Sequence, residues 1–250
     1  MQIDQTPVLL TSSAIAHDPA VALSDRQDRI ALTLASVAQW RRIRPHSPLV
    51  LCDGSSYDFT ADVARLFPAA PIECLVFENP QNLVKQYGRG YGEGEIVRYA
   101  VQQSKYIQTA GAFAKCSAKL WVSNFQRCLS SWNGRMLCKG VFLNAFSPLK
   151  RTQWLHVDTR FYVASTAFYT NYFLNAHHQL GLHAGEGLEE CFKRVIEQNQ
   201  LTHLMFQHQP IVEGTGGGMG RAYRTSWTRR VKEQWRLGLV RGTKKYKKLF

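Results

Sequence analysis

Short apolar runs alternate with stretches of helical periodicity over the first half of the chain. Each run has the length of a buried strand. Between the first two runs, Ile30, Leu34 and Val37 recur at helical spacing. Strands that alternate with helices predict a mostly parallel α/β sheet that binds ligands at the carboxyl ends of its strands. The four runs are Val8–Leu10, Leu49–Cys52, Ile72–Phe77 and Phe113–Val122.

The second half of the chain predicts two further strands and two further helices. Asp158 and Arg160 follow the second of these strands, where they could bind the hydroxyl groups of a ligand or pair with each other. The residues alone do not separate these two interpretations. The strands are expected at Val141–Phe146 and Trp154–Val157, and the helices from about Ser165 and Glu186.

Four glycines alternate with other residues from Gly88 to Gly94, just before a helical pattern. Backbone without Cβ atoms can turn tightly and bring its N–H groups close to an anion at a helix N-terminus. We therefore interpret this stretch as a glycine-rich anion-binding loop, followed by a helix from Glu93 that Gly111 terminates.

Lys115, Ser117 and Lys119 interrupt the apolar run Phe113–Val122. Three polar groups at one strand end belong to a site more often than to a core. The alternative interpretation is a strand flanked by lysines that face the solvent, and spacing alone favours neither.

The segment from Lys115 to Asn124 resembles a motif of glycosyltransferases with the GT-A fold. In many of them the strand reads approximately Lys-x-Asp-x-Asp-x-Phe-x-Asn, and its Asp-x-Asp turn holds a divalent metal on the diphosphate of a sugar nucleotide. Here Lys115, Trp121 and Asn124 match, whereas Ser117 and Lys119 replace the two aspartates. The resemblance implies a GT-A-like (Rossmann-like), mostly parallel central sheet flanked by helices. It also implies that a lysine neutralises the diphosphate directly.

A second similarity follows the second predicted strand. Similar glycosyltransferases carry Asp-Gly-Ser-x-Asp there, with the first aspartate on the nucleotide base or ribose. This chain has Asp53-Gly54-Ser55-Ser56-Tyr57-Asp58, with one extra residue, and Asp-Gly-Ser is also an ordinary turn sequence. From the resemblance, the residues expected to bind the sugar nucleotide are Ser12, Asp53, Gly92, Arg98, Lys115 and Lys119.

The resemblance also implies a catalytic carboxylate near the start of the last predicted helix of the body. In inverting GT-A enzymes such a group removes the proton of the acceptor hydroxyl. Glu189 is the first candidate, Glu190 and Asp158 are the others, and Arg160 is expected to bind the acceptor. Acidic residues also favour any helix N-terminus, because they oppose the helix dipole.

No metal ligands and no cofactor are assigned, because the Asp-x-Asp motif that would hold Mn²⁺ or Mg²⁺ is missing. The histidines at 177, 178 and 183, and those at 203 and 208, match no familiar zinc spacing. The glycines from Gly214 to Gly220 predict a hinge or closing loop, without the Lys-Ser/Thr ending of a P-loop.

Charge divides the chain into two parts. The net charge is +13 over 250 residues, and eleven Lys or Arg against one Glu lie in 221–250. We therefore expect a single domain at 1–220 and a basic tail at 221–250. The first residues do not form a signal peptide, and no run approaches the roughly 20 apolar residues of a membrane-spanning helix. Six cysteines without a Cys-x-x-Cys pair favour reduced thiols in a cytosol.

The tail alternates aromatic and basic residues. Trp227, Val231, Trp235 and Leu239 follow at steps of four, a pattern typical of an interfacial helix. We expect it to hold the protein at the inner face of the cytoplasmic membrane, where lipid-linked acceptors are made; a solvated tail is the alternative, and nucleic acid a less favoured polyanion. The expected contacts are Trp227, Arg229, Arg230, Trp235, Lys244 and Lys245.

Together these features favour a glycosyltransferase that moves a sugar from a sugar nucleotide to a glycan or lipid-linked acceptor in cell-surface glycan synthesis. One alternative is a non-enzymatic nucleic-acid-binding protein that uses the basic tail, for which no recognition motif is found. The other is a different α/β transferase, such as a sulfotransferase, which also needs basic residues near an anion.

Overall fold

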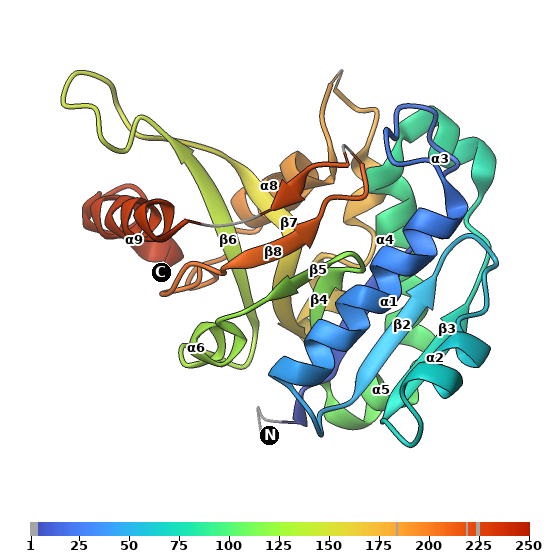
Figure 1. Ribbon diagram of the computed structural model, residues 1–250. Coiled ribbons are helices and arrows are strands. Elements are labelled where there is room, and N and C mark those ends of the chain that lie inside the picture. Colours follow the sequence, from blue (N-terminus) through green and yellow to red (C-terminus); the bar gives the residue numbers. More distant parts are fainter. Residues whose placement is uncertain (1–4, 184, 219, 224–225) are drawn as a thin grey trace.

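The computed structural model describes residues 5–183, 185–218, 220–223 and 226–250, and its centre is a six-stranded sheet (Figure 1). The strand order is β3-β2-β1-β4-β7-β6. The first four are parallel, β7 is antiparallel to β4, and β6 is antiparallel to β7. The predicted fold class, a mostly parallel sheet flanked by helices, is confirmed. The strands are β1 (Val8–Ser12), β2 (Leu49–Asp53), β3 (Ile72–Val76), β4 (Ala112–Ser117), β6 (Met136–Leu143) and β7 (Gln153–Ser165).

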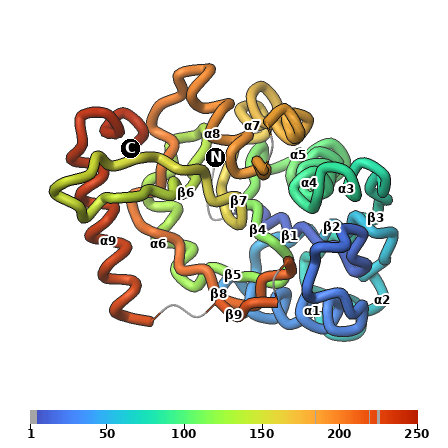
Figure 2. Tube along the Cα trace, turned by 90° about the horizontal axis from the view of Figure 1, so that it is seen from above, coloured from blue at the N-terminus to red at the C-terminus, as the bar shows by residue number. Residues whose placement is uncertain are grey.

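Helices cover both faces of this sheet, as the view from above shows (Figure 2). The helices α1 (Arg26–Ile43) and α2 (Thr60–Leu66) lie on one face. On the other face lie α3 (Gln81–Tyr87), α4 (Arg89–Gln103), α5 (Lys105–Ala110), α7 (Thr166–Tyr172), the 3₁₀ helix η2 (Ala176–Gln179) and α8 (Leu188–Gln198). A small antiparallel sheet, β5 (Leu120–Val122), β8 (Val212–Thr215) and β9 (Ala222–Tyr223), lies beside α1, and α6 (Phe125–Leu129) follows β5.

Burial on both faces explains why the strands read as continuous apolar runs. In β1, Leu9 belongs to the hydrophobic core under α4, while Val8 and Leu10 belong to the core under α1. Successive side chains of a strand point to opposite faces, so a sheet with two buried faces needs an apolar residue at every position.

The predicted glycine-rich loop is wrong, because α4 begins at Arg89 and contains Gly90, Gly92 and Gly94. These glycines allow close packing of the helix instead. A Cβ added to Gly94 would lie 2.2 Å from Cγ of His177, and one on Gly92 would lie 3.0 Å from Nδ2 of Asn79. Glycine costs about 1 kcal/mol relative to alanine within a helix, and the close approach of neighbouring elements offsets that cost.

The expected strand end at Asp158 and Arg160 is also wrong, because β7 continues through both residues to Ser165. The polar Asp-Thr-Arg triplet interrupts the apolar pattern without interrupting the strand. It does so because Asp158 and Arg160 pair with each other, which makes a buried polar step in a strand tolerable. Gly111 does terminate a helix, with a left-handed conformation and φ of 65°. That helix is α5, because the predicted single helix from Glu93 is divided at Ser104, which ends α4 and caps α5.

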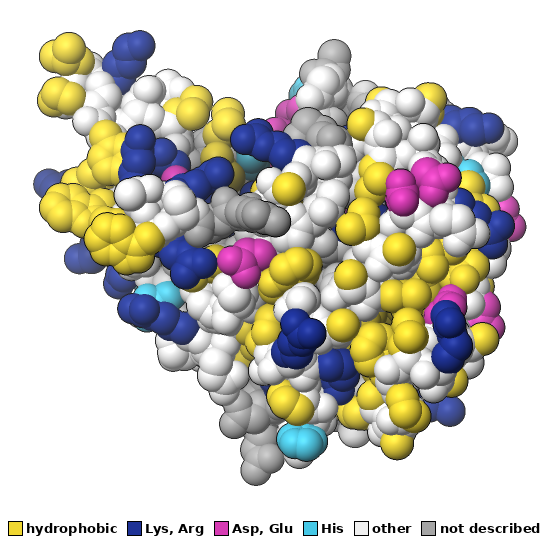
Figure 3. Space-filling model, in the orientation of Figure 1, with side chains coloured by type: hydrophobic (Ala, Val, Ile, Leu, Met, Phe, Trp, Pro, Cys, Tyr) yellow, Lys and Arg dark blue, Asp and Glu magenta, His cyan; other side chains and the backbone are white. Residues whose placement is uncertain are grey.

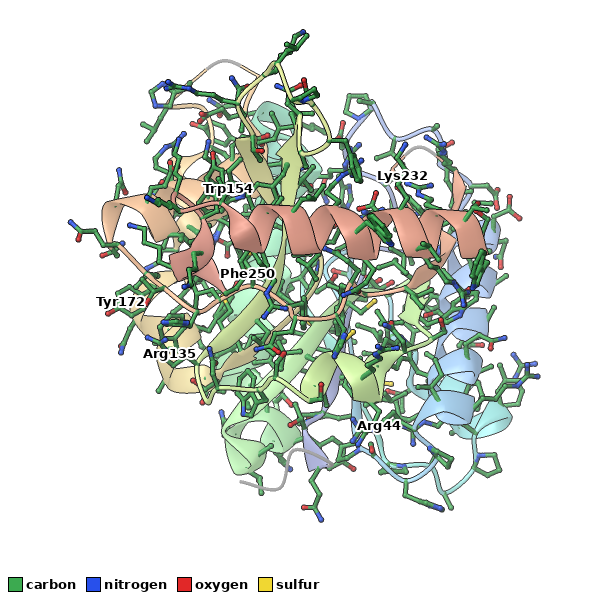
Figure 4. All side chains as sticks on the ribbon, turned by 90° about the vertical axis from the view of Figure 1, so that its left-hand side faces the viewer. Arg44, Arg135, Trp154, Tyr172, Lys232 and Phe250 are labelled. Atoms are coloured by element: carbon green, nitrogen blue, oxygen red, sulfur yellow. The ribbon has the colours of Figure 1, made fainter. Side chains whose placement is uncertain are left out.

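The tail is a helix whose end packs into the body. Helix α9 (Trp227–Gly242) buries Leu237 and Val240 and is followed by the 3₁₀ helix η3 (Lys247–Leu249). Leu249 is buried, and its carbonyl oxygen accepts hydrogen bonds from the N–H groups of Leu204 and Met205, both at 2.8 Å. Figure 4 shows α9 lying along one side of the molecule, with Phe250 near its C-terminal end. Among the described residues, no helix has both the length and the apolar character to cross a membrane.

Candidate functional site

A cleft of about 650 Å³ lies at the carboxyl ends of the parallel strands. Its floor comes from the ends of β1 and β4, one wall from α4 and the start of α8, and another from β7 and the turn between β8 and β9. This is the edge of an open α/β sheet where ligands are expected. Of the sequence-predicted site residues, the structure brings Ser12, Gly92, Lys119, Asp158, Arg160 and Glu189 to this cleft.

Lys119 stands in the turn between β4 and β5 and lines the floor of the cleft. Its side chain is almost fully buried, with 6% of the residue exposed. Its ammonium makes no hydrogen bond or ion pair to a described residue. Burial lowers the pKa of Lys119 to about 7; the nearby Arg29 acts in the same direction, and Asp53 opposes it. A buried cation without a partner is costly unless a ligand provides the opposite charge.

Arg29 adds a second cation to the same side of the cleft. It lies on α1, and among the described residues its hydrogen-bond acceptors are the backbone carbonyl groups of Ser13 at 2.7 Å, Leu23 at 2.8 Å and Gly217 at 3.3 Å. Burial lowers the pKa of Arg29, and Asp53 opposes the shift. The guanidinium stays charged, because arginine starts from a pKa above 12. Sequence reasoning missed this residue.

Asp53 lies beneath the cleft instead of on its surface. It is fully buried, and its two carboxylate oxygens accept hydrogen bonds from the N–H groups of Ala14 at 2.8 Å and Ser55 at 2.8 Å, and from the Ser55 hydroxyl at 2.6 Å. Asp53 thereby joins the loops that follow β1 and β2. Its role in this structure is to position those loops, and its negative charge acts to raise the pKa of both Lys119 and Arg29.

Lys115 is likewise committed to the protein interior. Its ammonium donates to the carboxylate of Glu93 at 2.6 Å and to the carbonyl oxygen of Thr159 at 2.9 Å, and its side chain is 0% exposed. Glu93, which sequence reasoning missed, is at the wall of the cleft. The pair is electrically neutral and leaves Lys119 as the lysine of β4 and its turn that can meet an anion.

The two glutamates at the start of α8 differ in their surroundings. Glu189 lines the cleft, and burial raises its pKa, with further contributions from the carboxylates of Glu93, Glu190 and Asp158. The Glu190 carboxylate instead accepts from the N–H of Gly187 at 2.9 Å and lies 3.4 Å from Nδ1 of His156. Glu189 is therefore the better placed proton acceptor.

Asp158 and Arg160 face the cleft as a pair. The Nε of Arg160 donates to Asp158 at 2.7 Å, and the guanidinium lies 4.7 Å from the ring centre of Tyr223. Burial acts to raise the pKa of Asp158, but hydrogen bonds and charge from Arg160 outweigh it and lower the pKa to about 2. A carboxylate held this firmly is a poor proton acceptor, so the geometry favours pairing over general-base catalysis for Asp158.

Two buried polar atoms at the wall of the cleft have no hydrogen-bond partner among the described residues, the Ser12 hydroxyl and Oδ1 of Asn79. Buried polar groups are rarely left unsatisfied, and exceptions often mark a ligand site. Arg98 lies outside the cleft, because it projects from α4 toward Glu95, 3.5 Å away. The tail residues that were expected to bind a membrane do not line the cleft either.

The residues at the Asp-x-Asp positions do not suit a divalent metal. Ser117 offers one hydroxyl, which already accepts from Lys115 at 3.3 Å, and Lys119 offers a donor instead of an acceptor. Mn²⁺ and Mg²⁺ need several oxygen ligands, carboxylates above all. Asp53, a neighbouring carboxylate, is already satisfied by backbone and hydroxyl donors.

No protein-family model and no curated protein matches this chain in sequence. Solved structures do match in fold. A galactosyltransferase, LgtC, in complex with donor and acceptor sugar analogues superposes with a TM-score of 0.50 at 6% identity, over 75% of this chain and 69% of its own. The chain has the fold of GT-A nucleotide-diphospho-sugar transferases.

Two further solved structures match with lower scores. A putative nucleotide-diphospho-sugar transferase from Desulfovibrio desulfuricans has a TM-score of 0.48 at 7% identity, over 81% of this chain and 79% of its own. A 4-diphosphocytidyl-2C-methyl-D-erythritol synthase from Anaerococcus prevotii has a TM-score of 0.47 at 8% identity, over 94% and 99%.

We expect Asp53→Ala to lower the free energy of unfolding by about 3 kcal/mol or more. The substitution leaves several buried donors unpaired, each at a cost of about 1–3 kcal/mol. Asp28→Ala is the matched control, because this exposed carboxylate near the start of α1 contributes less than about 1 kcal/mol. Urea denaturation measures both. Equal stability of the two variants would show that Asp53 does not hold the loops together.

Proposed function

We propose that this GT-A-fold protein transfers a sugar from a nucleoside-diphosphate sugar to an acceptor hydroxyl, with Lys119 and Arg29 in place of a divalent metal. The observation that carries the proposal is the buried Lys119 ammonium at the end of β4, which has no partner among the described residues. A diphosphate in the cleft would supply the missing negative charge. As the sugar departs, the two cations would stabilise the charge that develops on the leaving diphosphate.

The donor would lie along the basic side of the cleft. Its diphosphate would contact Lys119 and Arg29, and the backbone turn at Gly217 lies close by, since a Cβ there would be 3.7 Å from Nζ of Lys119. The unpaired Ser12 hydroxyl and Asn79 amide oxygen would meet polar groups of the nucleoside or sugar. In this placement the donor would form the hydrogen bonds that these two buried atoms lack.

The acceptor would enter the cleft from the side that Glu189 and Asp158 line. Glu189 would take the proton of the attacking hydroxyl, since burial raises its pKa and makes it a stronger base than an ordinary glutamate. The Arg160–Asp158 pair and the ring of Tyr223 offer a polar and an aromatic surface suited to a sugar. The bond from the anomeric carbon to the diphosphate breaks, and a bond to the acceptor oxygen forms.

The reaction products separate this proposal from nucleotidyl transfer on the same fold. A glycosyltransferase releases a nucleoside diphosphate, whereas a nucleotidyltransferase consumes a nucleoside triphosphate and releases pyrophosphate. The nucleotidyl reaction would need room for a triphosphate, and the neutralised Lys115–Glu93 pair contributes no charge for it.

The exposed residues of α9 favour attachment of the protein to a membrane surface, where the reaction would take place. Trp227 is 75% exposed and Trp235 69% exposed on the outer side of α9, while the buried Leu237 and Val240 hold the helix to the body. Figure 3 shows hydrophobic and basic side chains gathered at this end of the molecule. Aromatic and basic side chains on one surface favour attachment to an anionic bilayer.

The hairpin between β6 and β7 extends the same surface. Its Leu149 is 94% exposed and is followed by the exposed Lys150 and Arg151. Phe146 of the hairpin lies 5.8 Å from the ammonium of Lys232 and 5.5 Å from the guanidinium of Arg236, both on α9. Helix and hairpin tip therefore offer apolar and cationic groups together to one lipid surface.

We expect Lys119→Ala to weaken sugar-nucleotide binding or turnover at least tenfold, about 1.4 kcal/mol. Lys119→Arg keeps the charge and should retain more affinity, and Lys105→Ala, at an exposed lysine outside the cleft, should change nothing. Calorimetric titration with UDP-, GDP- and dTDP-sugars in EDTA measures the effect. Full affinity in Lys119→Ala, or loss of wild-type binding in EDTA, would overturn the proposed role.

We expect Glu189→Gln to lower kcat by a factor of about 10² to 10⁴ with the Kd of the donor unchanged, because glutamine keeps the shape but accepts no proton. In the wild type, kcat should fall as pH drops through the raised pKa of Glu189, since the protonated form is inactive. Glu190→Gln is the matched control and should turn over normally. Normal turnover by Glu189→Gln would place the base elsewhere.

We expect the full chain to sediment with anionic vesicles and to stay in the supernatant with neutral ones. Each basic residue near an anionic leaflet contributes about 1 kcal/mol. The double variant Trp227→Ala, Trp235→Ala should bind at least tenfold more weakly, and Leu66→Ala, at an exposed leucine of α2, should bind normally. Point variants are preferred to truncation because Tyr246 and Leu249 are buried. Equal sedimentation of all three proteins would exclude α9 as the attachment site.

A further inference from the structure

Glu95, His177 and His178 meet on the side of α4 that faces away from the cleft. Glu95 lies on α4, and the two histidines are consecutive in η2. Oε1 of Glu95 is 2.7 Å from Nε2 of His177 and 3.2 Å from Nε2 of His178. One ligand-type atom from each residue lies within 4.8 Å of the other two. None of the three lines the cleft.

The packing around His177 shows that its ring position is built into the fold. Gly94 allows the imidazole to lie against the backbone of α4, because a Cβ at this glycine would be 2.2 Å from Cγ of His177. The ring of Tyr91 lies 5.2 Å from that of His177 and 6.0 Å from that of His178. His177 is 1% exposed, whereas the side chain of His178 is 43% exposed, so solvent reaches the cluster from one side.

We propose that Glu95, His177 and His178 form a binding site for one divalent transition-metal ion, best suited to Zn²⁺, that fixes η2 to α4. Two imidazole nitrogens and one carboxylate oxygen form a recognised three-ligand set for zinc, and water completes the coordination on the open side. With ligand distances of about 2.0–2.2 Å, tetrahedral geometry needs roughly 3.3–3.5 Å between ligand atoms. The two distances from Oε1 of Glu95 to the histidine nitrogens, 2.7 Å and 3.2 Å, would have to lengthen by less than about 1 Å to reach it.

The ion would act on the cleft through the elements that it joins. Glu93 lies at the cleft wall, two residues before Glu95. Side chains two positions apart in an α-helix point to nearly opposite sides of the helix. Beyond η2, Leu180 lines the cleft, and the chain then leads to α8 and Glu189. The metal would hold the acceptor side of the cleft in place without contacting either substrate, a role independent of the proposed reaction.

The competing explanation is a hydrogen-bonded cluster that binds no metal. A variant of Arg98 distinguishes the two explanations. Its guanidinium lies 3.5 Å from Oε1 of Glu95 and competes with a cation for that carboxylate, although its side chain is 38% exposed and free to turn outward. Arg98→Gln should therefore bind zinc at least as tightly as the wild type. If the cluster serves only as a hydrogen-bonded contact, neither the wild type nor Arg98→Gln binds zinc.

The test is titration of the chelator-treated full chain with Zn²⁺ in competition with a chromophoric chelator, alongside Co²⁺ absorption. We expect one equivalent with a Kd in the micromolar range or tighter and a Co²⁺ spectrum of nitrogen and oxygen ligands. His178→Ala, at an exposed position, should weaken binding at least tenfold, and so should Glu95→Gln. His183→Ala is the matched control, since His183 is exposed and outside the cluster, and should bind normally.

Stability gives a second measurement. Zn²⁺ should raise the Tm of the wild type and of His183→Ala, but not that of His178→Ala, because only a ligand that binds the folded state stabilises it. Absence of zinc binding, equal affinity in His178→Ala, or a thiolate absorption band with Co²⁺ from one of the six free cysteines would each overturn the proposal.

Discussion

A buried ammonium without a protein partner is the constraint on which the cleft depends. Lys119 is held out of water beside Arg29, and Asp53 is the carboxylate that opposes both. Asp53 is itself surrounded by N–H and hydroxyl donors, so it reduces the repulsion without neutralising the site. The protein therefore places two basic side chains against one carboxylate at the carboxyl ends of β1 and β4, and the pKa of Lys119 falls to about 7. This is the property that a diphosphate site needs, and the remaining polar groups of the cleft are arranged around it.

Helix α4 connects the two halves of this arrangement. Its glycines bring it close to η2 and to the loop of Asn79, and its Glu93 neutralises Lys115, which keeps the second lysine of β4 out of the anion site. The opposite face carries Glu95 and its two histidines. Helix α4 thus lies between the charged residues of the cleft and the candidate metal site. A small shift of α4 would move both Glu93 and Glu95.

The fold could be read from the sequence because its signal is local. Parallel strands that are covered on both faces are mostly apolar, so β1 to β4 stand out as runs. The site was only partly readable. Lys119 was found through the resemblance to a metal-binding turn, whereas Arg29 was missed because an arginine on a helix is usually solvated. Its burial could have been inferred from the stripe Arg29, Thr33, Ser36 and Trp40, which share one buried helix face.

Other features could not be read, because they depend on contacts between distant segments. The glycines of α4 resembled a phosphate loop until the structure placed His177 and Asn79 against them. The spacing of residues along the chain could not identify a third ligand beside His177 and His178, because Glu95 is 82 residues away from His177. Leu237 and Val240, which do not fit the apolar stripe of the tail, are the residues that hold α9 to the body.

Proton uptake on donor binding tests the central claim most directly. Because the pKa of Lys119 is about 7 in the free cleft, this amine is mostly neutral at pH 8. A diphosphate that binds the charged form must raise that pKa, so binding should draw a proton from the solvent. Calorimetric titration of the tightest-binding sugar nucleotide at pH 8, in EDTA and in two buffers of different ionisation enthalpy, counts these protons. We expect uptake of about one proton per donor in the wild type and almost none in Lys119→Arg; binding without proton uptake, or equal uptake by both proteins, would contradict a diphosphate site built on Lys119.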